Sequence, residues 1–177
     1  MTRRTVLKMS AALPLARYAC AFQGQRKRIS PHETVSVDVN GKTLTITYGR
    51  PYLKSRTVGK EVAPFGQVWR LGADEATKIT VPMDAVIGSV KVGAGSYSLF
   101  AIPGEDKWTM IVNKTADQWG AFSYDQSKDI GRFDLPVQKP SSPVEEFTIS
   151  LDKQPENTVK LTFAWGDQMV STTLKPA

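Results

Sequence analysis

Cysteine and histidine are nearly absent from this chain of 177 residues, which contains one of each. Zinc clusters, Cys-Xaa-Xaa-Cys redox pairs and histidine-rich metal sites all need more of these ligands than the chain provides. A Ser-His-Asp triad would have to use His32, which precedes the first expected strand. The composition therefore predicts neither a metal site nor a cofactor, and it argues against a histidine-based hydrolase.

A strong excess of positive charge is also lacking once the N-terminal segment is set aside. The formal net charge is +6, but four of the 23 basic residues lie in the first 21 positions. A chain without that segment has 19 basic and 17 acidic residues, a net charge of +2. This is too little charge for a surface that binds a phosphate backbone, so we expect no nucleic-acid partner. After position 21 no apolar run is long enough to cross a bilayer, so we expect no transmembrane helix there.

The first 21 residues have the order of an export signal. Residues 2–8, TRRTVLK, resemble the twin-arginine pattern, and the apolar stretch that follows is too short to span a membrane. Ala19-Cys20-Ala21 fits the small-x-small cleavage rule, and cleavage after Ala21 removes the one cysteine. We therefore expect an exported protein that is periplasmic or extracellular.

An alternative makes Cys20 the lipid-bearing first residue of a lipoprotein, although the preceding Arg17-Tyr18-Ala19 departs from the usual lipobox. In either case residues 1–21 are interpreted as a signal, residues 22–33 as a polar linker and residues 34–177 as a single domain.

Short runs of β-branched and aromatic residues, separated by Gly, Pro and Asp, continue from Thr34 to the end of the chain. Asn40-Gly41 predicts a type I′ hairpin, because both central residues must accept positive φ. Two runs, Leu99–Ile102 and Trp108–Val112, are apolar on both faces and predict a central hairpin covered on both sides. The chain is therefore predicted to be all-β, a single antiparallel β-sandwich of about eleven short strands, with a jelly roll as one candidate topology. The expected strands are Thr34–Val39, Thr43–Tyr48, Val68–Arg70, Thr77–Val81, Val86–Val92, Tyr97–Ile102, Trp108–Asn113, Ile130–Leu135, Glu146–Leu151, Thr158–Trp165 and Met169–Leu174.

The densest polar cluster is WRLGADEAT at residues 69–77. Loops at the rim of a sandwich often carry functional sites. Arg70 is suited to hold an anionic or hydroxyl-rich ligand, with Asp74 or Glu75 as general acid or base. The alternative is structural: Arg70 pairs with one of these carboxylates and fixes the turn, while adjacent carboxylates in an extended chain point apart.

Two aromatic clusters are further candidates. Arg56 and Trp69 belong to a basic and aromatic stretch, and Trp119 and Tyr124 belong to the segment WGAFSYD. Aromatic faces and guanidinium groups both bind sugars and anions. The alternative is that the aromatic side chains pack in the core and the cations lie in a solvated loop.

Three ordered motifs resemble a known family. They are YGRPYLKSRTVGKEVAPFGQVWRLGADEATKITV, VGAGSYSLFAIPGEDKWTMIVNK and WGAFSYDQSKDIGRFDLPV. Together they are similar to the bacterial family catalogued as domain of unknown function 2911, over about residues 30–174. The resemblance implies a small exported or lipid-anchored β-sandwich protein and no particular activity. Asp74 stands where the family more often has Asn, which affects any role that needs an amide.

Three hypotheses follow. The first is an exported envelope protein that acts as a non-catalytic binding module for a carbohydrate-like or anionic ligand. The second is a cofactor-free hydrolase or isomerase that uses Asp74 or Glu75 with Arg70 as electrostatic stabiliser. The third is a scaffold that presents a sheet edge to another envelope protein. A carboxylate of raised pKa beside Arg70 would favour the enzyme, and exposed aromatics lining a groove would favour the binder. The ligand-binding candidates are Arg56, Trp69, Arg70, Glu75, Trp119 and Tyr124.

Overall fold

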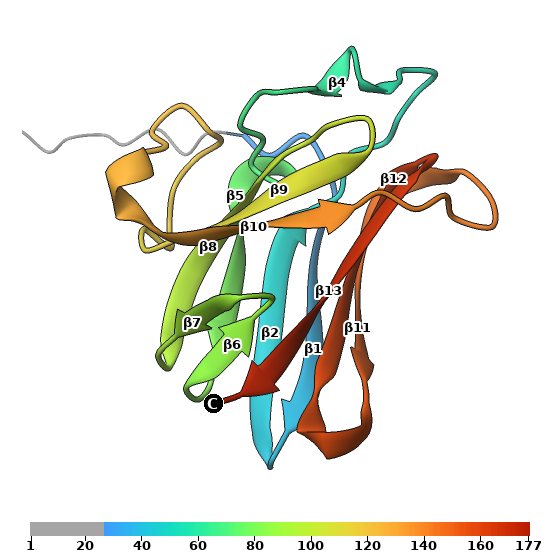
Figure 1. The fold of residues 1–177 in the computed structure, drawn as a ribbon. Coiled ribbons are helices and arrows are strands. Elements are labelled where there is room, and N and C mark those ends of the chain that lie inside the picture. Colours follow the sequence, from blue (N-terminus) through green and yellow to red (C-terminus); the bar gives the residue numbers. More distant parts are fainter. Residues whose placement is uncertain (1–26) are drawn as a thin grey trace, which may run out of the picture.

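The computed structural model describes residues 27–177, so the expected signal and the first part of the linker lie outside the described residues. The described chain forms two sheets that pack face to face (Figure 1). All strand pairs within these two sheets are antiparallel. The predicted all-β sandwich is therefore confirmed.

The first sheet has six strands in the order β1-β2-β5-β8-β9-β10, and the second has five in the order β11-β12-β13-β6-β7. Most neighbours in a sheet are also neighbours along the chain. In a jelly roll, by contrast, consecutive strands mostly alternate between the two sheets, so this strand order differs from that of a jelly roll. The strands of the first sheet are β1 (His32–Val39), β2 (Lys42–Gly49), β5 (Ala73–Val81), β8 (Gly95–Ile102), β9 (Lys107–Asn113) and β10 (Asp129–Pro136). Those of the second are β11 (Val144–Lys153), β12 (Val159–Gly166), β13 (Gln168–Pro176), β6 (Ala85–Ile87) and β7 (Val90–Val92).

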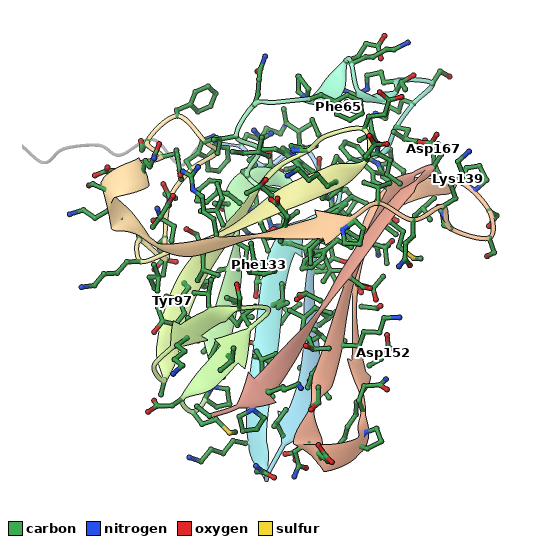
Figure 2. The ribbon with its side chains drawn as sticks, in the orientation of Figure 1. Phe65, Tyr97, Phe133, Lys139, Asp152 and Asp167 are labelled. Carbon is green, nitrogen blue, oxygen red and sulfur yellow. The ribbon has the colours of Figure 1, made fainter. Side chains whose placement is uncertain are left out.

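A third, two-stranded element lies in the long excursion between β2 and β5. Its strands, β3 (Val58–Gly59) and β4 (Val62–Pro64), pair in parallel. The ring of Phe65 lies over Gly59 and is seen near β4 at the upper end of Figure 2. Two short 3-10 turns, η1 (Gln126–Lys128) and η2 (Pro155–Asn157), complete the described secondary structure.

Both predicted hairpins are confirmed. Asn40 and Gly41 join β1 to β2 with φ of 54° and 71°, as a type I′ turn requires. Strands β8 and β9 pair as the expected central hairpin. One face of this hairpin lies in the main core, and on the other face Phe100 and Ile111 are covered by Ala121 and Tyr124.

Three strand predictions differ from the structure. Val68–Arg70 is not a strand, since Trp69 forms only an isolated bridge to Ala101. Strand β5 begins at Ala73, four residues before the expected start. The expected strand Val86–Val92 is a tight hairpin of β6 and β7, because Gly88 has φ of 60° and reverses the chain beneath the ring of Phe133 (Figure 2).

A cluster of aromatic side chains fills one end of the core. Trp69 stacks on Trp165 with ring centroids 5.5 Å apart, and it meets Trp108 and Phe147 edge to face at 5.6 and 5.0 Å. These partners come from β12, β9 and β11 respectively. The cluster therefore joins both sheets to the loop that carries Trp69.

Arg50 closes the adjoining edge of the sandwich. Its guanidinium lies 3.1 Å from Glu33 of β1 and 3.2 Å from Glu146 of β11, and it donates to Thr148 at 3.2 Å. The clamp ties the first sheet to the second beside the aromatic cluster.

The backbones of β2 and β5 approach closely where Gly49 pairs with Ala73, and this close approach gives a test of the fold. A Cβ at Gly49 would lie 2.3 Å from the carbonyl oxygen of Ala73. Gly49→Ala should therefore lower the free energy of unfolding by about 1–3 kcal/mol or more, measured by urea unfolding. The matched control is Gly93→Ala, whose added Cβ would meet nothing nearer than Asp84 at 3.7 Å. Equal stability of the two variants would contradict the close approach of Gly49 to Ala73.

Candidate functional site

The start of β5 is irregular, and this irregularity builds the site. Thr47 of β2 pairs with Lys78, but Gly49, only two residues on, pairs with Ala73. The intervening residues of β5 therefore bulge out of the ladder. Leu71 and Asp74, neither of them glycine, have φ of 52° and 61°. Such positions cost free energy and are held only where the surroundings determine them.

The bulge turns two adjacent carboxylates toward one partner. His32 Nε2 lies 3.2 Å from Asp74 Oδ2 and 3.4 Å from Glu75 Oε2. The expectation that these side chains point apart is therefore wrong here, because residue 74 is not extended.

A segment that we call the N-terminal strap, residues 28–32, lies on these carboxylates. Asp74 accepts hydrogen bonds from the backbone N–H groups of Ile29 and Ser30, both at 3.2 Å. Glu75 Oε1 accepts from Arg28, whose Nε and Nη2 lie 2.8 and 2.7 Å away. Strand β1 thus begins inside the segment interpreted as a linker, and that segment contacts the candidate site.

These contacts set the charge state of Glu75. Partial burial alone would raise its pKa, but the hydrogen bond and the positive charge of Arg28 outweigh burial, so that the pKa of Glu75 is lowered overall. Glu75 is therefore ionised at neutral pH. A lowered pKa is the opposite of what a general acid requires.

Arg70 precedes the bulge and forms no ion pair within residues 27–177, unlike the structural alternative in which it pairs with Asp74 or Glu75. Its Nε is buried without a hydrogen-bond partner among the same residues. Burial lowers the pKa of Arg70, and the charge of Asp74 offsets only part of this effect. The arginine is therefore held in place by packing and not by pairing.

Two connected hollows, which we call the Arg70 cleft, surround this guanidinium. The first, of about 310 Å³, has Trp69 and Trp165 among its lining residues. The second, of about 510 Å³, is walled by Ile29 and Ser30 of the N-terminal strap. The residues common to both hollows are Pro51, Arg56, Arg70 and Ala73.

Arg56 supplies a second cation to the cleft. Its guanidinium donates to the carbonyl oxygens of Leu53 and Tyr52 at 2.8 and 2.7 Å. These bonds fix the side chain without neutralising it, because both acceptors are uncharged.

The remaining predicted site residues are dispersed. Trp69 is 8% exposed and belongs to the core cluster, although it also lines the cleft. Trp119 is partly buried and pairs through its backbone with Glu75. Tyr124 lies in a separate network, where its hydroxyl donates to Asp129 at 2.7 Å and accepts from Arg132 at 2.6 Å. The structure thus gathers Arg56, Trp69 and Arg70 around one cleft and places Tyr124 elsewhere.

Sequence reasoning missed two contributors, His32 and Gln118. The sequence suggests only that His32 is poorly placed for a Ser-His-Asp triad, and Gln118 belongs to no recognisable motif. Both reach the site through chain reversals that bring residues 28–32 and 116–119 beside β5. A glutamine in a polar loop gives no signal by itself.

Within residues 27–177 no group of three or more His, Cys, Asp and Glu side chains is placed to hold a metal ion. Over the same residues no helix has the length and hydropathy needed to cross a membrane.

Comparison with known proteins gives one match. A family model described as "Protein of unknown function (DUF2911)" matches residues 30–174. No curated protein and no solved structure matches the chain.

The unpaired arginine leads to a prediction about stability. A buried donor without an acceptor costs about 1–3 kcal/mol, so Arg70→Met should leave the free energy of unfolding unchanged or raise it by up to that amount. The matched control is Arg50→Met, which removes a guanidinium paired with Glu33 and Glu146 and should be destabilising. Urea unfolding measures both variants, and an Arg70→Met protein as unstable as Arg50→Met would contradict the assignment.

The lowered pKa of Glu75 leads to a prediction about pH. A carboxyl whose pKa is lower in the folded state stabilises the fold above its unfolded pKa and loses this contribution as pH falls through the folded pKa. The difference in Tm between the wild type and Glu75→Gln should therefore be largest near neutral pH and shrink on acidification below the ordinary glutamate range. A difference that is constant from pH 7 to pH 3 would show that the ionised carboxylate contributes nothing.

Proposed function

The chain belongs to the DUF2911 family of proteins of unknown function, and we propose that it is a non-catalytic binding protein whose Arg70 cleft holds a small anionic ligand. One observation carries this proposal: Arg70 lines both hollows, and its buried Nε has no acceptor among the described residues. A carboxylate or phosphate oxygen is the acceptor that best satisfies a guanidinium.

Charge and shape support an anion more than a neutral ligand in this cleft. Arg56 and Arg70 line both hollows, and Lys54 lines the outer one. Glu61 and Asp74 also lie on the walls, where they accept hydrogen bonds from the backbone N–H groups of Thr57 and of the N-terminal strap. The lining thus carries three cations against two carboxylates, an excess of one positive charge. The indoles of Trp69 and Trp165 also line the first hollow, but they are only 8% and 2% exposed and offer a ligand little apolar surface.

Catalysis by the neighbouring carboxylates has less support. An acid catalyst needs a raised pKa, whereas the pKa of Glu75 is lowered. Asp74 accepts from two backbone N–H groups and lies beside His32, so its oxygens are already engaged by the strap. The binding function is therefore preferred over a hydrolase or isomerase.

Export remains part of the proposal and rests on the sequence. TRRTVLK, the short apolar stretch and the Ala19-Cys20-Ala21 site follow the order of an export signal. An exported binding module would meet its ligand in the periplasm or outside the cell, with lipidation at Cys20 as the alternative form of the same location.

Thermal unfolding in the presence of anions tests this function. Phosphate, citrate and short dicarboxylates would be titrated at constant ionic strength. A ligand at 100 times its Kd adds about 2.7 kcal/mol to stability, so at least one of these anions should raise Tm.

Two variants locate the effect. The Tm shift should be lost in Arg70→Met, which is expected to fold at least as well as the wild type. It should be retained in Lys160→Gln, which removes one exposed positive charge from β12. Equal shifts in the wild type and Arg70→Met, or no shift with any anion, would contradict an anion site at Arg70.

A further inference from the structure

A separate hollow lies on the opposite side of the bulge in β5. It measures about 170 Å³, and we call it the Glu75 pocket. Its lining comes from the strap, from β2, from β5 and from the loop 116–118. Arg70 and Arg56 do not line it, so the pocket is distinct from the Arg70 cleft.

Two residues that line this pocket each carry a buried acceptor oxygen without a hydrogen-bond donor. Within the described residues three buried side-chain polar atoms lack a hydrogen-bond partner: Arg70 Nε, Glu75 Oε2 and Gln118 Oε1. The two acceptors belong to residues that line the Glu75 pocket. A buried acceptor without a donor is costly, so the occurrence of two of them on residues that line one small hollow points to a ligand that donates hydrogen bonds.

The side chains of Glu75 and Gln118 are fixed by other contacts, which supports a ligand that donates hydrogen bonds to them. Gln118 Nε2 donates to Ser98 Oγ and to the carbonyl of Thr115, both at 3.0 Å, and these bonds orient Oε1. The other carboxylate oxygen of Glu75 is bound by Arg28. His32 Nε2 lies 3.4 Å from Glu75 Oε2 but does not complete a hydrogen bond. The hydrogen bonds of the Gln118 amide nitrogen and of Glu75 Oε1 thus fix the positions of the two unsatisfied oxygens.

The charges around the pocket favour a neutral donor. Arg28 and Lys78 line it beside Glu75 and Asp117, and each cation is paired with one of these carboxylates. An ammonium ligand would meet two cations at short range, whereas a hydroxyl can donate to an oxygen and accept from an N–H group. Mixed donors and acceptors around a small volume match a hydroxylated ligand.

We propose that the Glu75 pocket binds one small neutral polyol, of the size of a single monosaccharide ring, through hydroxyls that donate to Glu75 and Gln118. A hollow of about 170 Å³ has room for a ligand of this size. This site goes beyond the anion-binding function and does not depend on it, because a different observation on different residues carries it.

Ligand-observed NMR and calorimetry with glucose, galactose and myo-inositol test the proposal on the intact protein. At least one of these polyols should bind the wild type. Ala116→Leu, which extends a side chain from the lining, should weaken binding at least tenfold, and Ala116→Ser, which keeps the space, should not. Absence of binding to the wild type, or equal binding to both variants, would overturn the proposal.

Two further variants separate this site from the Arg70 cleft. Glu75→Gln removes one acceptor without changing the side chain's shape and should also weaken polyol binding, which covers the case in which Ala116→Leu fails to fold. Arg70→Met should bind the polyol as the wild type does. Loss of polyol binding in Arg70→Met would place the ligand in the Arg70 cleft and overturn the assignment. The anion-dependent Tm shift should persist in Ala116→Leu, so failure of one site is distinguishable from failure of the other.

Discussion

The packing of Trp69 against three aromatic partners is the constraint on which the candidate site depends. Trp69 lies in a loop, yet its ring stacks on Trp165 and meets Trp108 and Phe147 edge to face. Its indole N–H also donates to the carbonyl of Gly72 at 3.1 Å. Aromatic pairs of this kind contribute about 0.5–1.5 kcal/mol each beyond their area burial. Together, the three aromatic pairs offset the cost of about 1–3 kcal/mol for the unsatisfied Nε of the neighbouring Arg70. The fold can therefore hold Arg70 in this position.

The bulge in β5 organises the polar groups around this anchor. A regular strand would alternate Asp74 and Glu75 between the two faces of the sheet. Positive φ at Asp74 breaks the alternation, so that both carboxylates lie within 3.4 Å of His32, while Asp74 also lines a hollow with Arg70. The result is an unsatisfied donor in one hollow and unsatisfied acceptors in another. Two ligands of opposite hydrogen-bonding character therefore fit the two hollows better than one ligand fits both.

Local patterns predicted the parts of the fold that short segments determine. The Asn40-Gly41 hairpin follows from turn chemistry, and the doubly covered β8–β9 hairpin follows from residues that are apolar on both faces. The start of β5 could not be predicted in this way, because the residue types at Leu71 and Asp74 do not by themselves indicate a positive φ. In the site, Arg56 and Arg70 were found by residue type alone. Gln118 was not found, because only long-range packing brings it beside Glu75.

The N-terminal strap connects these features and belongs to the folded domain. Arg28, Ile29, Ser30 and His32 all contact Asp74 or Glu75, and strap residues line both the Arg70 cleft and the Glu75 pocket. Asp74 is 9% exposed with the strap in place, and the strap supplies two backbone N–H donors to its carboxylate, so removal of the strap would both uncover this carboxylate and take away its donors. The family match begins at residue 30, inside the strap, and so includes its Ser30 and His32. Glu75 accepts from Arg28 of the strap through Oε1 and also lines the pocket, so a ligand that donates to its second oxygen adds to the contacts of a side chain that the strap already holds.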